Sequence, residues 1–248
     1  MRTLKPLVTL VLLTALFASL VGCNINSSVE VADGASHDGD ASTINGSVEV
    51  GDDAVVDGDV GNINGSIRIG SNSTVNEVGN VNGSIRIGDG SSASEVESVN
   101  GSIALGDEVT VGGDVASING DINGGVSVQI GGEVESVNGT VTLNTGSNVA
   151  GRISTANGSI RLTGTTAASL ETRNGSIDLR DGTQILGRVL VKDVNDTRSR
   201  PEVYIGQDVE VVGPLVFEQD VDLYIHESAR VGEIQGAEPM PYPDRNGD

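Results

Sequence analysis

Six acidic side chains recur at one place in a repeated pattern, five residues before a repeated asparagine. They are Asp40, Asp59, Glu77, Glu95, Asp114 and Glu133. If the repeats stack, these carboxylates form one column, in which neighbours about 4.8 Å apart repel by roughly 1 kcal/mol in water. Carboxylate oxygens are hard ligands, so the column could hold Ca²⁺ or Mg²⁺ weakly or could face a partner. The pattern favours the other interpretation, a solvated face that keeps the protein soluble.

Asparagine marks the centre of every repeat. The repeated residues are Asn26, Asn45, Asn64, Asn82, Asn100, Asn119, Asn138, Asn157 and Asn174. Successive copies are 17 to 19 residues apart, and seven of them read Asn-Gly-Ser or Asn-Gly-Thr, which matches a glycosylation acceptor. A structural role is favoured, because stacked Asn amides can hydrogen-bond along an axis and Asn-Gly suits a tight corner.

Groups that could support catalysis are sparse. His37 and His226 lie near opposite ends of the pattern and cannot share a site. Polysaccharide-cleaving β-helices use aromatic platforms beside long loops, but between Ala18 and Val203 this chain has no aromatic residue. No phosphate-binding loop, zinc-ligand spacing, nucleophile elbow or calcium-type nonapeptide occurs. We therefore expect no catalytic residue, and no cofactor other than weakly bound Ca²⁺.

The single cysteine follows a targeting segment. Residues 1–22 start with basic side chains and contain an apolar run of 14 residues, Leu7 to Leu20, which is too short to span a bilayer comfortably. The sequence Leu-Val-Gly-Cys that ends at Cys23 resembles the lipobox of bacterial lipoproteins. The resemblance implies cleavage before Cys23 and acylation of its thiol and of the new amine, and several acyl chains give stable anchoring. Because Asn24 follows, the resemblance also implies sorting to the outer membrane, if the host has one.

Charge and cysteine content restrict the partners. Removal of residues 1–22 takes away Arg2 and Lys5 and leaves 12 basic against 35 acidic residues, a net charge of −23. Nucleic acid and anionic lipid are therefore excluded as electrostatic partners. With no second cysteine, no disulfide can form within the chain. The expected partners are a membrane, reached through the acyl chains, and an unidentified protein or glycan of the cell envelope.

The apolar residues around each Asn define the elements that position these groups. Ile103 and Leu105 follow Asn100 by three and five residues, an alternation typical of a half-buried strand. Val96 and Val99 precede it by four and one, and this odd spacing predicts a corner between them. Asn-Gly predicts a second corner, and a Gly six residues after each Asn predicts a third.

Three corners in each period predict an all-β chain, a triangular parallel β-helix with rungs of 17 to 19 residues. Roughly eleven rungs about 4.8 Å apart would make a rod about 50 Å long. The chirality of parallel crossovers predicts a right-handed coil. A stack of antiparallel hairpins is the alternative, since Asn-Gly is also a strong hairpin signal, but the odd spacing argues against it. A left-handed hexapeptide helix is disfavoured, because the apolar positions are not six apart.

The expected order of segments can be read along the chain. It comprises a signal peptide at 1–22, a lipid-anchor site at 23–24, a β-helix at 25–192, a protruding loop at 193–201, terminal rungs with a cap at 202–236, and a disordered tail at 237–248. In the cap, Tyr204, Phe217 and Tyr224 are expected to close the end of the core. Within the β-helix, Asp121–Gly125 holds a second Asn-Gly out of phase, which predicts a bulged corner.

Two families resemble parts of the chain. The segment Val81–Gly88, which reads Val-Asn-Gly-Ser-Ile-Arg-Ile-Gly, resembles the repeat of adhesin domains from bacteria, over about residues 25–180. This implies a non-enzymatic envelope rod with an acidic interaction surface, used in adhesion. Val109–Val115 and Ala150–Ile153 resemble bactofilins, polymer-forming β-helical proteins whose rods join end to end, which implies a self-assembling scaffold. Bactofilins are usually cytoplasmic, and the targeting segment departs from that. Neither family supplies catalytic residues.

Overall fold

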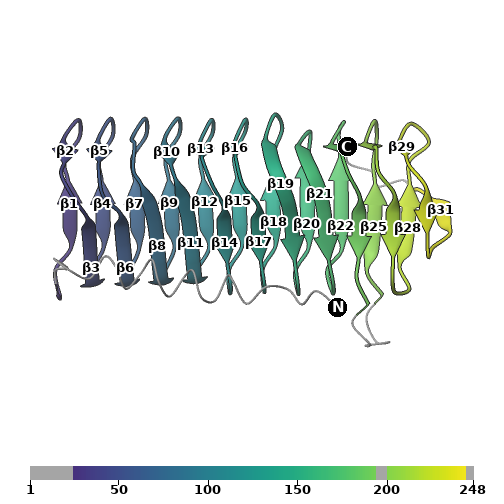
Figure 1. Ribbon diagram of the computed structural model, residues 1–248, viewed down its shortest axis with the longest axis horizontal. Coiled ribbons are helices and arrows are strands. Elements are labelled where there is room, and N and C mark those ends of the chain that lie inside the picture. The colour runs from purple at the N-terminus through teal and green to yellow at the C-terminus, as the bar shows by residue number, and fades with distance from the viewer. Residues whose placement is uncertain (1–24, 194–199, 244–248) are drawn as a thin grey trace.

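The computed structural model describes residues 25–193 and 200–243, which form one rod of stacked turns (Figure 1). Its 31 strands pair only in parallel, and no helix occurs in this part of the chain. The predicted all-β parallel β-helix is thus confirmed, and the hairpin stack is excluded. Accordingly, no helix long and apolar enough to cross a membrane is found among these residues. The predicted signal peptide and anchor site, and most of the loop at 193–201, lie outside the described residues.

One side of every turn belongs to a 12-stranded sheet. Its strands, in order, are β1 (Val29–Val31), β4 (Val48–Val50), β7 (Ile67–Ile69), β9 (Ile85–Ile87), β12 (Ile103–Leu105), β15 (Ile122–Gly124), β18 (Val141–Leu143), β20 (Ile160–Thr163), β22 (Ile177–Arg180), β25 (Glu202–Ile205), β28 (Asp222–Ile225) and β31 (Pro239–Pro241). Equivalent residues lie opposite one another, so that Ile103 pairs with Ile85 and with Ile122. Twelve strands in one column give the eleven steps that the repeat predicts.

The second side of the turn is a short strand. Its strands are β2 (Ser36–His37), β5 (Val55–Val56), β10 (Ser92–Ala93), β13 (Thr110–Val111), β16 (Gln129–Ile130), β23 (Gln184–Ile185), β26 (Glu210–Val211) and β29 (Arg230–Val231). β2 and β5 form a separate two-stranded sheet near the N-terminal end of the rod.

The third side is longer and ends at the repeated Asn in the first turns. Its strands are β3 (Ala41–Asn45), β6 (Val60–Asn64), β8 (Glu77–Asn82), β11 (Glu95–Asn100), β14 (Val115–Ser117), β17 (Val134–Ser136), β24 (Val189–Val191), β27 (Leu215–Phe217) and β30 (Ile234–Gln235). Two further strands, β19 (Asn148–Thr155) and β21 (Thr166–Thr172), run through the second and third sides. They join the two sides into one 17-stranded sheet.

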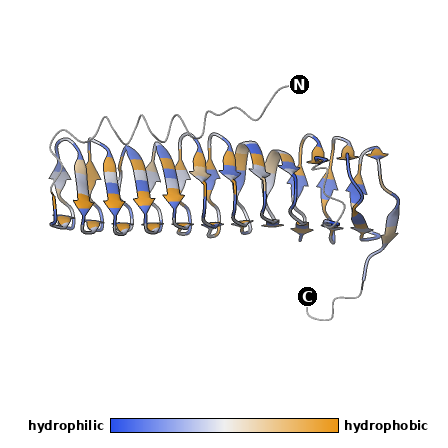
Figure 2. Ribbon diagram, turned by 90° about the horizontal axis from the view of Figure 1, so that it is seen from below, coloured by the Kyte–Doolittle hydropathy of each residue, from blue (hydrophilic) through white to orange (hydrophobic). Residues whose placement is uncertain are grey.

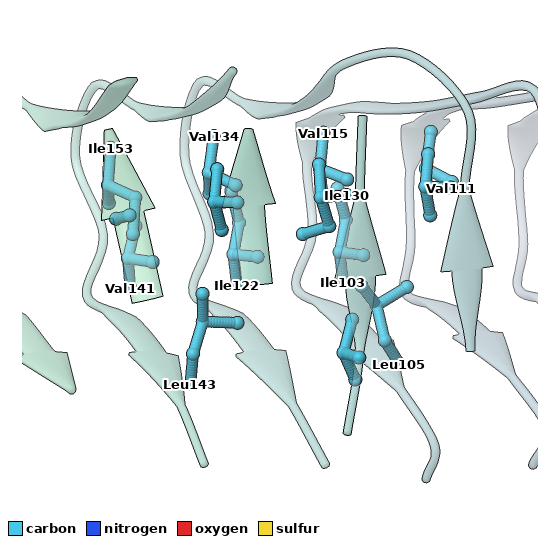
Figure 3. Packing of buried hydrophobic residues seen from close by; sticks show 14 of the residues in the cluster. Ile103, Leu105, Val111, Val115, Ile122, Ile130, Val134, Val141, Leu143 and Ile153 are labelled. Atoms are coloured by element: carbon cyan, nitrogen blue, oxygen red, sulfur yellow. The ribbon is translucent and has the colours of Figure 1, made fainter. Parts of the chain in front are cut away.

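The core is a thin column of aliphatic side chains that continues from turn to turn (Figure 3). In one turn it takes Ile103 and Leu105 from the first side, Val111 from the second and Val115 from the third, all of them buried. Each such side chain contributes about 1.5–3 kcal/mol by leaving water. Along the strands, apolar residues alternate with polar ones (Figure 2). In β7 and β9 the apolar residues are buried and the Arg between them is exposed, so neighbouring turns are needed to bury the column.

The corner predicted between Val96 and Val99 is wrong. β11 runs straight through this region, so Val96 and Ser98 are buried while Val99 is only half-buried on the outer face. The corner instead lies just before β11, because Ala93 and Val96 are both buried although they are three positions apart and would face opposite sides of a straight strand. The turn has three sides as predicted, but one of its corners lies closer to the N-terminus than the spacing predicted.

The bulged corner predicted at Asp121–Gly125 is also wrong. Ile122 pairs in regular register with Ile103, so the second Asn-Gly lies inside strand β15. Gly124 takes an inward position, where an ideal Cβ would lie 2.6 Å from the Cδ2 atom of Leu143. The Leu143 side chain of the next turn therefore fills the core space that this Gly leaves.

The tyrosines of the last turns do not close the core. Tyr204 and Tyr224 alternate with buried residues of β25 and β28, and their rings stack outside the core, 4.7 Å apart between centroids and 10° from parallel. The ring of Tyr242 packs edge-on against Tyr204, which leaves Tyr204 only 8% exposed. Phe217 is buried in β27, opposite Val191. Of the three aromatic residues assigned to the cap, only Phe217 joins the core.

The disordered tail predicted from Ala237 is wrong for its first residues. β31 pairs in parallel with β28, so that Met240 lies opposite Tyr224 and adds a further turn to the stack. The tail was predicted because prolines stand on either side of Met240, but proline is tolerated in a strand at the edge of a sheet. Residues 244–248 lie outside the described part.

Candidate functional site

The repeated asparagines form a continuous ladder of amides along one corner. The Nδ2 atom of Asn100 donates to Oδ1 of Asn82 over 3.0 Å, and Nδ2 of Asn119 donates to Oδ1 of Asn100 over 2.8 Å. Eight such hydrogen bonds, between 2.7 and 3.0 Å, connect all nine side chains from Asn26 to Asn174. The amides therefore bind one another along the rod, as the stacking argument expects.

A second polar column lies inside the rod, two residues before each Asn. Its members are Thr43, Asn62, Asn80, Ser98, Ser117, Ser136, Thr155 and Thr172, all buried. Nδ2 of Asn80 donates to the carbonyl oxygen of Gly65 over 2.8 Å, and Oγ of Ser117 donates to that of Gly101 over 3.3 Å. A buried carbonyl needs such a donor. Sequence reasoning missed this column, although strict alternation from Val96 would have placed Ser98 inside.

The Gly of each Asn-Gly pair allows neighbouring turns to approach. An ideal Cβ on Gly120 would lie 2.1 Å from the carbonyl oxygen of Gly101, and one on Gly139 would lie 2.0 Å from that of Gly120. No side chain fits in that space, since real Cβ atoms keep more than 3.0 Å from backbone atoms. Glycine is thus required at this corner because the turns stack too closely for a Cβ atom.

The six acidic residues do lie in one column, at the corner before the third side. Glu95 pairs directly with Glu77. Val115, the residue after Asp114, pairs with Val96 and Val134, which places Asp114 between Glu95 and Glu133. The column follows the edge of the rod, with one carboxylate in each turn.

The aspartates of this column cap the main chain of the next turn. Oδ1 of Asp40 accepts the N–H of Asp59 over 3.0 Å, and Oδ1 of Asp114 accepts the N–H of Glu133 over 2.7 Å. Oδ1 of Asp59 accepts Nδ2 of Asn76 over 2.8 Å. One oxygen of each Asp is therefore already bound within the rod. The carboxylates stabilise the stack because they accept hydrogen bonds from donors at the corner of the next turn.

Another corner, after the first side, uses the same device. Oδ1 of Asp89 accepts the N–H of Asp107 over 2.9 Å, and Oδ1 of Asp107 accepts that of Val126 over 2.7 Å. Asp33 and Asp52 act alike in the first turns. Sequence reasoning missed these residues, although an Asp recurs there directly after the third-corner Gly.

The carboxylates near the middle of the rod have perturbed pKa values. Burial raises the pKa of Glu95, and the negative charges of Glu77 and Asp114 raise it further. Glu97, on the outer face of β11, is 9% exposed, and burial followed by the charge of Glu95 raises its pKa to about 8. The raised pKa of Glu97 favours its neutral form, which lowers the negative charge beside this part of the column.

A basic residue ends the acidic column. Ile153 pairs with Val134, so Arg152 follows Glu133 in the column. Its guanidinium contacts Glu133 over 2.9 Å and Glu171 over 3.3 Å. Lys192 also pairs with Glu171. The unbroken run of acidic residues at this corner thus ends before Arg152, and its C-terminal limit is a local ion-pair network.

The other candidate groups are placed as follows. His37 lies in β2 and His226 follows β28, near opposite ends of the rod. His226 Nδ1 contacts Oγ of Ser228 at 2.9 Å. No group of three or more His, Cys, Asp or Glu side chains within residues 25–193 and 200–243 is arranged to hold a metal ion. Cys23 lies outside the described residues.

Comparison with family models, with curated proteins and with solved structures found no match for this chain. The function must therefore be inferred from the rod itself.

Proposed function

We propose that this chain is a lipid-anchored, non-enzymatic rod of the bacterial cell envelope that presents an acidic surface to a partner, as in adhesion. The observation that carries the proposal is the start of the stack. β1 begins at Val29, six residues after Cys23. An acylated Cys23 would therefore hold the first turn of a rod close to the membrane, with no linker between them.

The arrangement of the carboxylates supports a binding role over a catalytic one. General acid–base chemistry needs two groups that converge on one substrate. Here the acidic residues follow a corner at one per turn, and oxygens of Asp40, Asp59 and Asp114 accept hydrogen bonds from the next turn. A convex corner that repeats at about 4.8 Å suits an extended partner with regularly spaced donors or cations.

A self-assembling scaffold is the second candidate, and the last turn argues against it. In a parallel strand, successive residues direct their N–H and C=O groups to opposite neighbours. In β28 the N–H groups of Asp222 and His226 donate to the preceding turn, so those of Leu223 and Ile225 point to the next one. Pro239 and Pro241 lie opposite Leu223 and Ile225, so their nitrogens face the open edge of β31. Proline has no N–H, and this end therefore offers fewer donors to a second rod. We infer that the rods do not polymerise through their C-terminal ends.

A Cys23→Ala variant tests the anchor in a host that processes lipoproteins. We expect the unaltered chain to sediment with membranes and to need detergent for release, whereas the variant is recovered in the soluble envelope fraction. The matched control is Ser91→Ala, a change in a buried corner residue far from the N-terminus. Equal membrane association of Cys23→Ala and the unaltered chain would contradict the proposed anchor.

A further inference from the structure

Asn-Gly pairs carry a reaction of their own. The backbone nitrogen of the Gly attacks Cγ of the Asn, a new C–N bond closes a succinimide, and Nδ2 leaves as ammonia with the proton from the Gly nitrogen. Water then opens one of the two imide C–N bonds and gives aspartate or isoaspartate. The reaction needs only water, because Gly offers little steric hindrance. Its rate in a folded chain depends on how firmly the Gly nitrogen and the Asn side chain are held.

The ladder holds all the Asn side chains alike. Asn64 and Asn138, taken from the two halves of the rod, each donate through Nδ2 to the preceding Asn and accept at Oδ1 from the following one. Attack on Cγ requires the same two hydrogen bonds to loosen in either half. The ladder therefore does not make these sites differ in reactivity. Any difference in rate between them must come from the hydrogen bonding of the Gly nitrogen.

In the first turns the Gly nitrogen is engaged. The N–H of Gly46 donates to the carbonyl oxygen of Asn64 over 3.2 Å, and that of Gly65 to the oxygen of Asn82 over 3.0 Å. The N–H of Gly83 likewise donates to the carbonyl oxygen of Asn100 over 3.1 Å. These three glycines have φ values of +156°, +143° and +140°. The attacking atom of Asn45, Asn64 and Asn82 is thus bound to the following turn.

In the later turns the hydrogen bonds run differently. The N–H of Asn119 donates back to the carbonyl oxygen of Val99 over 2.8 Å, and the equivalent bonds of Asn138 and Asn157 also measure 2.8 Å. The glycines that follow, Gly120, Gly139 and Gly158, donate no backbone hydrogen bond within the described part of the chain. Their φ values lie outside the positive region. The peptide between Asn and Gly is therefore oriented differently in the two halves.

We propose that the later Asn-Gly corners are sites of spontaneous deamidation, with water as the co-reactant, and that the earlier corners are protected. The reactive residues are Asn119, Asn138 and Asn157, and the protected ones are Asn45, Asn64 and Asn82. The product carboxylate has no N–H to donate, so each event removes one link of the ladder and adds a negative charge. Isoaspartate also lengthens the main chain by one carbon, which disturbs the register of the next turn.

Peptide mapping by mass spectrometry tests the proposal on the full chain with Cys23→Ala, incubated at mildly alkaline pH. The same incubation in concentrated urea gives the unprotected rate of each site, and the ratio of the two rates is its protection. We expect Asn45, Asn64 and Asn82 to be at least about fivefold better protected than the later sites, since one net backbone hydrogen bond separates the two sets.

An internal control lies in the same rod. Asn123-Gly124 is an Asn-Gly pair inside the paired strand β15, so we expect it to be protected in the folded chain and reactive in urea. Equal protection of the two sets, or stronger protection of Asn119, Asn138 and Asn157, would overturn the proposal.

Discussion

Replacing Gly120 by Ala is expected to lower the free energy of unfolding by about 3 kcal/mol or more, a large effect for one methyl group. The added Cβ would lie 2.1 Å from the oxygen and 2.4 Å from the carbon of the Gly101 carbonyl. Both are backbone atoms of the turn below, so relief requires the two turns to separate. Separation would also stretch the amide link between Asn119 and Asn100, which spans 2.8 Å.

Gly112→Ala is the matched control. It is the same substitution on an exposed corner, where the nearest atom to an ideal Cβ is the Ser94 carbonyl oxygen at 3.7 Å. Its effect should stay within about 0.5 kcal/mol. Urea unfolding followed by circular dichroism compares the two variants. Similar midpoints for both would mean that the close approach of glycines does not hold the turns together.

We infer that the unaltered rod is monomeric, and replacing Pro239 and Pro241 together by Val is expected to produce end-to-end assemblies. Valine restores an N–H at both positions and favours extended backbone. The open edge of β31 would then carry a row of donors and acceptors that matches β1 of a second rod. Because each junction buries fresh strand edge, the average assembly should grow with protein concentration.

Sedimentation analysis over a range of concentrations measures this outcome, in chains that carry Cys23→Ala. Pro214→Val, a change inside the stack just before β27, controls for the loss of a proline as such and should stay monomeric. A double variant that also stays monomeric would show that the prolines are not what prevents association. Long polymers of the unaltered protein would contradict the assigned role of this end.

The repeat predicted the stacking well, because the spacing of apolar residues within one period determines which residues lie above one another in successive turns. Ile103 and Leu105 alternate with an exposed position, and a residue equivalent to each recurs one period later, which is enough to define a strand and its neighbour. The Asn ladder followed from the same spacing. What failed was the assignment of Val99, whose β-branched side chain suits an outer strand position as well as a core one.

Other features depend on contacts between turns, which spacing alone does not show. Ser117 is inside, where its hydroxyl donates to the carbonyl oxygen of Gly101, and it takes the inward place that the spacing assigned to the apolar residue after it. Asp114 caps the next turn, whereas Glu95 and Glu97 perturb each other's pKa values instead. Whether an acidic residue caps the next turn depends on the length of its side chain and on the direction of the N–H at the corner. That direction is a property of the folded stack.

The central claim is that equivalent residues stack directly above one another along a straight axis. Electron–electron distance measurements between spin labels at corner positions test it, with Ser66 and Thr140 four turns apart and Ser47 and Ser176 seven turns apart. Backbone separations of about 19 and 34 Å are expected, in proportion to the number of turns. Distances that do not scale with the number of turns would contradict the rod.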